Sequence, residues 1–291
     1  MILILSSKVP IRFSCRYFSV CPSSFYYWKK TKKIEFFNKK ESIKRKIKRI
    51  FDESKDTYGS PRIHRELLKK SIKISENTVA KYMNKLGLDA RLKKKYKVQT
   101  TDSNHKSPIA PRLFKVEEEG CLPKEPGKIL AGDITYLRLG KNKFLYLAVV
   151  LDLYNREVVG WSMSRSLETG VILDALDAGM KKVGPDAEVI FHSDRGSQYA
   201  SEAYRKLLKS KNGIPSMSRR GNCYDNAYVE SWFGLLKREW IYRRQYFSER
   251  ELRGLVFEYI ETWYNNKRSH TALDYRSPKE YKLSHNSAKK V

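Results

Sequence analysis

The chain has 291 residues, enough to bury a sizeable core, and 41% of them are hydrophobic, which excludes a disordered polymer. Its net charge of +27 is extreme for an ordinary enzyme and indicates a polyanionic partner, foremost nucleic acid and less often an anionic membrane. Residues 1–100 carry +19 of this charge, because 27 Lys and Arg stand there against 8 Asp and Glu. We therefore expect a binding region at the front and chemistry further along the chain.

The cysteines and the apolar segments exclude further classes. The cysteines are scattered, with no Cys-x-x-Cys pair and no paired His near them, which disfavours zinc and fits free thiols in a reducing cytosol. They are Cys15, Cys21, Cys121 and Cys223. Lys8 interrupts the apolar start too early for a signal peptide, and no later segment approaches the roughly 20 apolar residues of a membrane span. The expected location is the cytoplasm, in association with the nucleoid.

The front of the chain is predicted to be helical and basic. Residues 39–51 place isoleucines at helical spacing between Lys and Arg, which predicts an amphipathic helix that either contacts DNA or carries solvated charge. Residues 57–90 predict two short helices joined by a tight turn, with Pro61 at the start of one and Gly87 at the end of the other. A helix-turn-helix and an ordinary helical hairpin share this pattern, and the basic surroundings favour the DNA-binding motif.

A basic run, RLKKKYK over 91–97, follows the helix-turn-helix and is suited to DNA phosphates. The candidate contacts in it are Arg91, Lys93, Lys94 and Lys95. The expected organisation is a basic helical region over 1–97, a proline-containing linker over 98–127, a catalytic core with a C-terminal helical extension over 128–285, and a tail over 286–291.

The core is predicted to begin with three strands joined by short links, which form an antiparallel meander. These strands are 129–139, 143–151 and 156–164. Helices at 168–182 and 201–212 then alternate with strands that end at Asp194 and cover 214–217, and a long helix begins near Asp225. This order defines an α/β fold, a ribonuclease-H-like mixed sheet flanked by helices, preceded by the all-α DNA-binding region.

Three acids stand where such a sheet would expose them. Asp133 lies in the first strand, Asp194 lies at the exit of the fourth, and Glu230 lies in the long helix with 35 residues between it and Asp194. Carboxylates from separate elements suit hard divalent cations, and two Mg²⁺ ions about 4 Å apart can activate water and stabilise the leaving oxygen of a phosphodiester. Each acid alone is more often a turn, cap or surface residue, so the prediction depends on their joint arrangement.

Neighbouring polar residues support or compete with this triad. Asn226 and Lys237 lie four residues before and seven residues after Glu230, so all three share a helix face and are candidate DNA contacts. Asp152 is a rival for the first acid, but it opens a turn between two strands, where a capping role is expected. Asp225 is likewise expected to cap the helix.

At this point the sequence resembles a known family. Residues 129–283 look like the integrase core of bacterial insertion-sequence transposases, the DDE group related to retroviral integrases. The matching stretches are GDITYL, VVLDLYNREVVGWS, HSDRGSQY, GNCYDNAYVESWFGLLKRE and YNNKRSHTALDYRSPKEY. The stretch YGSPRIHRELLKK...TVAKYMNKLGL resembles the helix-turn-helix that precedes this core in the same family.

The resemblance implies a Mg²⁺-dependent enzyme, with Mn²⁺ as an alternative ion and two ions in the site. Such enzymes nick element ends with water and join the free 3′-hydroxyl to another strand. The triad carries over to Asp133, Asp194 and Glu230, and a basic helper to Lys237. The implied partners are double-stranded DNA, further copies of the chain in a synaptic complex, and the product of an upstream reading frame, to which active members are usually fused.

The sequence departs from the family at Leu130, where Trp is common, and we expect that change to affect packing rather than metal ligation. Two other interpretations remain open on the residues. One is a transposase-derived DNA-binding regulator without catalysis, which the intact triad disfavours. The other is a plain ribonuclease H, which the basic helix-turn-helix region disfavours.

Overall fold

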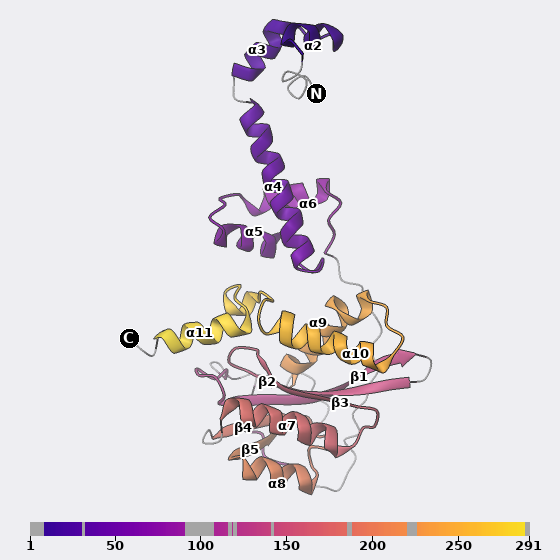
Figure 1. Ribbon diagram of the computed structural model, residues 1–291. Coiled ribbons are helices and arrows are strands. Elements are labelled where there is room, and N and C mark those ends of the chain that lie inside the picture. The colour runs from indigo at the N-terminus through magenta and orange to yellow at the C-terminus, as the bar shows by residue number, and fades with distance from the viewer. Residues whose placement is uncertain are drawn as a thin grey trace. The chain divides into compact units, whose positions relative to one another are not determined.

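A computed structural model of the chain describes residues 9–30, 33–90, 108–115, 118, 121–140, 143–184, 188–219 and 226–288. The chain forms two compact units, residues 1–91 and residues 92–291 (Figure 1). The basic run with Arg91, Lys93, Lys94 and Lys95 lies outside the described residues, as do Cys223 and Asp225.

The first unit is helical, as the sequence predicts. Its helices are α2 (Ile11–Tyr17), α3 (Pro22–Lys30), α4 (Lys33–Glu53), α5 (Ser60–Lys69) and α6 (Glu76–Lys85). Pro61 occupies the first turn of α5, and the Ser75 hydroxyl caps α6 by accepting a hydrogen bond from the backbone N–H of Thr78. Ile47, Ile63 and Val79 are fully buried, so α4, α5 and α6 share one small core. The predicted basic helix is thus longer than residues 39–51 and covers the helix pair.

The second unit is built on a five-stranded sheet with the order β3-β2-β1-β4-β5. The strands are β1 (Ile129–Gly140), β2 (Lys143–Asp152), β3 (Val158–Ser164), β4 (Val189–Ser193) and β5 (Gly213–Met217). The first three pair antiparallel, whereas β4 pairs parallel with both β1 and β5. The predicted meander and the mixed sheet are therefore confirmed.

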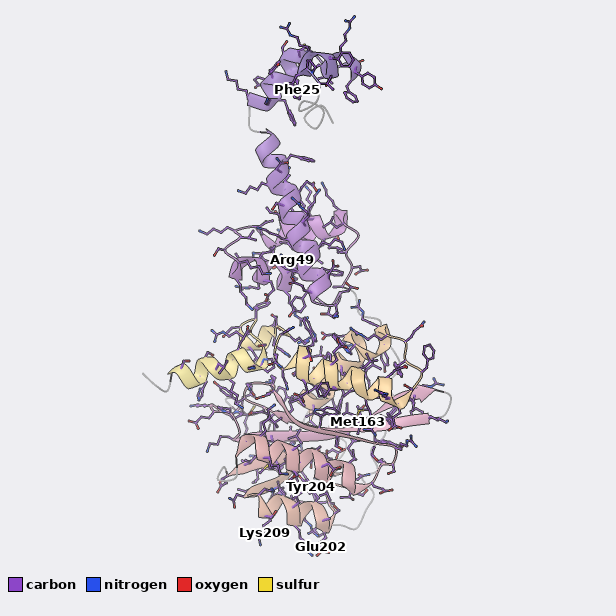
Figure 2. The ribbon with its side chains drawn as sticks, in the orientation of Figure 1. Phe25, Arg49, Met163, Glu202, Tyr204 and Lys209 are labelled. Atoms are coloured by element: carbon purple, nitrogen blue, oxygen red, sulfur yellow. The ribbon has the colours of Figure 1, made fainter. Side chains whose placement is uncertain are left out.

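Helices cover both faces of this sheet (Figure 1). One face carries α7 (Thr169–Val183) and α8 (Glu202–Ser210), and the other carries α9 (Ala227–Glu239), α10 (Glu249–Phe257) and α11 (Pro278–Ala288). A side chain at Gly160 of β3 would lie 2.2 Å from the carbonyl oxygen of Ala175, so glycine lets α7 approach the strand closely. On α8, Tyr204 is buried while Glu202 and Lys209 are exposed (Figure 2).

Part of the predicted linker over 98–127 is packed against the core. The hydroxyl of Ser216 in β5 accepts hydrogen bonds from the backbone N–H groups of Leu113 and Phe114, and Phe114 is buried. Pro111 accepts a hydrogen bond from the N–H of Met217. A proline-containing segment can still lie along a sheet edge where its missing N–H is not needed, which the composition alone did not indicate.

A buried ion pair joins the end of α9 to the C-terminal extension. The guanidinium of Arg268 donates to both carboxylate oxygens of Glu239, at 2.7 and 2.6 Å, and each side chain is 1% exposed. The hydroxyl of Tyr259 also donates to Glu239, and Tyr259 lies in a π-helical segment, Glu258–Tyr264. The ring of Trp232 on α9 and that of Trp240, directly after α9, pack against Tyr259. This cluster fixes how α9 lies on the sheet.

Arg268→Met tests this anchor. Removing one partner leaves the Glu239 carboxylate buried without its counter-ion, so we expect a loss of about 3–5 kcal/mol in the free energy of unfolding. Urea denaturation measures it. The control is Arg165→Met, because the Arg165–Glu249 pair is 82% exposed at Arg165 and should contribute below about 1 kcal/mol. Equal losses in the two variants would show that the buried pair is not an anchor.

Candidate active site

The parallel pairing of β1 and β4 brings two acids together. Ala131 in β1 lies opposite His192 in β4, and β1 makes no further pairs with β4 beyond that point. Continued by two residues, this register places Asp133 opposite Asp194, with both side chains on the same face of the sheet. Asp194 follows the last residue of β4, so both carboxylates lie where β1 leaves an open edge.

The electrostatics of Asp133 reflect this crowding. Desolvation raises the pKa of Asp133 well above its ordinary value, and the negative charges of Asp194 and Glu230 raise it further. The backbone N–H of Ile134, which donates to Oδ1 at 2.7 Å, and the ammonium of Lys237 oppose this rise. Asp133 is therefore within electrostatic reach of both other carboxylates, and each of the three residues is partly open to solvent.

The loop after β4 shapes the rim of the site. The backbone N–H of Gly196 donates to Oδ1 of Asp194 at 2.9 Å, and a side chain at Gly196 would lie 3.0 Å from the same oxygen. The side chain of Arg195 turns back to donate to the carbonyl oxygen of Ser218. A pocket opens between this loop and β1, and both Asp133 and Asp194 line it. Backbone can therefore approach a ligand closely at Gly196.

Helix α9 contacts β1 on both sides of Asp133. At its N-cap, Nδ2 of Asn226 donates to the carbonyl oxygen of Gly132 at 3.4 Å, and Oδ1 of this buried side chain has no hydrogen-bond partner among the residues that the structure describes. About three turns later, Nζ of Lys237 donates to Oγ1 of Thr135 at 2.6 Å. Desolvation lowers the pKa of Lys237 to about 8, against the attraction of Asp133. Glu230 lies between these two contacts, in the first turn of α9.

The donor set suits a hard divalent cation, because all three groups are carboxylates and their mutual repulsion is relieved by positive charge. Within the part of the chain that the structure describes, no three His, Cys, Asp or Glu side chains are gathered closely enough to hold an ion as they stand. The arrangement thus brings the acids near each other without completing a cage, and Mg²⁺ commonly keeps several water ligands beside one or two carboxylates.

The rival acids take structural positions. Asp152 is 1% exposed, and its two oxygens accept hydrogen bonds from the backbone N–H groups of Gly127 and Tyr154, so the expected turn-capping role is confirmed. The N-cap of α9 is Asn226 rather than Asp225, because the helix begins at Ala227. Leu130, where the family often has Trp, is fully buried in the core beneath α7.

Sequence reasoning missed the residues that line the open edge of β1. Thr135 holds Lys237, and Tyr136 contacts the same ammonium, whose nitrogen lies 4.9 Å from the ring centroid. Tyr199 is buried in the loop after Asp194, and the charges of Asp133 and Asp194 add to the desolvation that raises its pKa. Only the pairing of β1 with β2 and β4 reveals which of these side chains face the acids.

Comparison with known proteins decides the family. A sequence model described as Integrase core domain matches residues 123–223, a second of the same description matches 214–278, and one described as HTH-like domain matches 38–96. The chain is 38% identical over 245 residues to the transposase for insertion sequence element IS904 of Lactococcus lactis, covering 83% of this chain and 94% of that protein. The chain belongs to the family of insertion-sequence transposases. The resemblance noted in the sequence is confirmed.

A second transposase agrees with this assignment, and two solved structures are weakly similar to the chain. The chain is 36% identical over 280 residues to Transposase InsF for insertion sequence IS3A of Escherichia coli, and the match covers 94% of each chain. Among solved structures, the simian T-cell lymphotropic virus intasome chain matches with a TM-score of 0.46 at 14% identity, covering 77% of this transposase and 74% of that chain. The HTLV-2 integrase catalytic core domain in complex with magnesium matches with a TM-score of 0.42 at 13% identity, covering 54% and 97%.

The helices described in this transposase include none that is both long enough and apolar enough to cross a membrane.

The family models and the relatives establish the fold of an integrase core that follows an HTH-like domain in the chain, and they establish the activity of a transposase. The roles of Asp133, Asp194 and Glu230 remain a prediction.

The stability of the metal-free protein tests whether Asp133 is a functional or a structural acid. Because its pKa is raised, the folded chain holds the Asp133 proton more tightly than the unfolded chain. That stability is present below the unfolded pKa of about 3.9 and is lost as pH rises through the higher folded value. Asp133→Asn removes this loss, so we expect the variant to be more stable at pH 7, by on the order of 1 kcal/mol.

The measurement is urea denaturation against pH in buffer containing a chelator. Asp152→Asn is the comparison: burial also raises the pKa of Asp152, to about 6, but its two oxygens accept backbone N–H groups, and replacing one acceptor by an amide N–H should cost about 1–3 kcal/mol. If Asp133→Asn were destabilised as much as Asp152→Asn, Asp133 would be a structural residue.

Proposed function

We propose that Asp133, Asp194 and Glu230 together hold two divalent ions, Mg²⁺ or alternatively Mn²⁺, with which this transposase cuts and joins DNA. The observation that carries the proposal is the crowding of the Asp133 carboxylate by Asp194 and Glu230. Like charges are brought together at a cost in stability, and a function that binds cations explains why that cost is retained.

The expected chemistry is a hydrolysis followed by a transesterification, both at phosphorus. Ions on these carboxylates would polarise the phosphodiester and lower the pKa of the attacking group. In the first reaction, a water oxygen bonds to phosphorus and the bond to the 3′-oxygen breaks, which leaves a 3′-hydroxyl and a 5′-phosphate. In the second, the oxygen of that 3′-hydroxyl bonds to a phosphorus of the target strand, the bond from this phosphorus to the target's 3′-oxygen breaks, and the target strand is left with a free 3′-hydroxyl. No side-chain nucleophile is needed.

Two residues of α9 would position the DNA strand. Lys237 presents an ammonium beside Asp133, where it can attract a phosphate without coordinating a metal. Asn226 is buried and donates to Gly132, the residue before Asp133. Its side-chain carbonyl oxygen has no partner among the described residues, which suits a hydrogen bond to the substrate or to a metal-bound water. Both are proposed as DNA-contacting residues of the site.

The first unit would bind the element ends. The α5–α6 pair lies within the HTH-like match, and together with the net positive charge of this unit it suits a recognition helix in a major groove. The basic run with Arg91, Lys93, Lys94 and Lys95 suits contacts to DNA phosphates.

Because two ends must be held together, the active species is expected to be a homo-multimer. We further propose that it works with or is fused to an upstream-frame product, in the cytoplasm on nucleoid DNA.

The triad is tested by strand cleavage and strand transfer on element-end duplexes in Mg²⁺. Asp133→Asn, Asp194→Asn and Glu230→Gln should each lower both rates at least about 10³-fold, because several kcal/mol of charge stabilisation are lost, while DNA binding stays within twofold. Lys237→Ala should lower joining by about 10-fold or more with an unchanged Mg²⁺ requirement.

The control is Lys206→Ala, since Lys206 is 77% exposed on α8 and its loss should leave the rates unchanged. Near-normal strand transfer in any of the three acid variants would remove that residue from the triad. A shifted Mg²⁺ requirement in Lys237→Ala would mean that Lys237 supports the metals rather than the DNA.

A further inference from the structure

We propose that Tyr136 and Tyr146 form a binding subsite for one unstacked nucleobase of the strand being cut, beside the carboxylates. The inference rests on the proposed function, because it assumes that DNA enters between Asp133 and Asp194. It adds a substrate contact that the metal chemistry itself does not require.

The pairing of β1 with β2 places the two tyrosines side by side. Tyr136 lies directly opposite Tyr146 in the antiparallel ladder, so both side chains project from the same face of the sheet. Both are partly exposed, and both line the same pocket as Asp133, Asp194 and Leu167. These residues therefore line one cavity, which reaches round the open edge of β1, because Asp133 and Tyr136 are three residues apart and so lie on opposite faces of that strand.

One of the two rings is held in place by its surroundings. The ammonium nitrogen of Lys237 lies 4.9 Å from the centroid of the Tyr136 ring, and Phe144 packs against that ring at 5.4 Å with an interplanar angle of 88°. Lys237 is itself fixed by Thr135. Tyr136 is thus a fixed wall of the pocket, next to the lysine proposed to attract a phosphate.

The other ring is not engaged. The side chain of Tyr146 makes no hydrogen bond and no ring contact with any residue that the structure describes, including Tyr136 opposite it. Cross-strand aromatic pairs usually contact each other, so two opposed tyrosines whose rings stay apart leave an aromatic surface available. This surface faces the pocket rather than the core.

A nucleobase is the occupant that fits these walls. A phosphate would meet two carboxylates here, whereas a base offers a neutral, flat face that stacks on tyrosine regardless of its sequence. The phosphodiester attacked at Asp133 and Asp194 links two neighbouring nucleotides. The base of one of these nucleotides must therefore lie beside the two carboxylates. Unstacking one terminal base would also let the strand bend into the pocket.

The test measures binding of the full-length protein to a duplex with a three-nucleotide single-stranded 3′ overhang, with Ca²⁺ replacing Mg²⁺. One abasic site is moved through the overhang, one nucleotide at a time, and Kd is determined for each substrate. At one position, loss of the base should weaken binding by the parent about 10-fold. Tyr146→Ala and Tyr136→Ala should weaken binding of the intact overhang to the same extent and be insensitive to the abasic site.

Conservative and matched variants keep the result interpretable. Tyr146→Phe and Tyr136→Phe retain the ring and should behave as the parent, which separates stacking from a loss of fold. Phe247→Ala removes an aromatic ring that is 83% exposed elsewhere and should change nothing. The proposal is overturned if the Ala variants and the parent lose equal affinity at every abasic position. Because no cleavage is measured, that result would leave the acid-triad test of the proposed function unaffected.

Discussion

Two carboxylates held opposite each other on neighbouring parallel strands are the constraint on which the rest of this transposase depends. The β1–β4 register brings Asp133 and Asp194 together at the open edge of β1, and the α9 helix adds Glu230. Three negative charges in one partly desolvated place repel each other and oppose folding. The surrounding structure must therefore hold them by contacts that do not involve the acids themselves.

Those contacts can be followed from the core outward. Beneath β1 and β4, Leu130 and Phe191 are buried against α7 and α8, which fixes the two strands. Above them, Asn226 and Lys237 attach α9 to β1 on either side of Asp133. The buried Arg268–Glu239 pair then ties the far end of α9 to the C-terminal extension. A segment nearly forty residues beyond Glu230 in the chain thus helps to set where that carboxylate lies.

Much of this fold follows from the sequence, because its signals are local. Alternating strands, short links and apolar helix faces predicted the sheet and its flanking helices to within a few residues. Motif spacing and strand ends also mark the three acids, whose roles stay a prediction. The opposition of Asp133 and Asp194 was not predictable, since it depends on a parallel register between residues 61 positions apart in the chain, such as Ala131 and His192.

The errors have similar physical causes. The N-cap of α9 is Asn226 rather than Asp225, because either side chain suits a cap and tertiary contacts decide where the helix begins. The segment with Phe114 was interpreted as linker, but it packs on β5 through Ser216, a contact made across about a hundred residues. The pocket-lining tyrosines gave no sequence signal, because a tyrosine in a strand is ordinary until its neighbour across the ladder is known.

The most direct test of the central claim is binding of Mn²⁺ to the full-length protein, followed by electron paramagnetic resonance in the absence of DNA. Parent protein and the Asp152→Asn variant should bind the ion alike, whereas Asp133→Asn and Asp194→Asn should each weaken binding at least tenfold, since each removes a charged oxygen ligand. Unchanged Mn²⁺ affinity in both of these variants would contradict the account, because the opposed carboxylates would then not be the metal site.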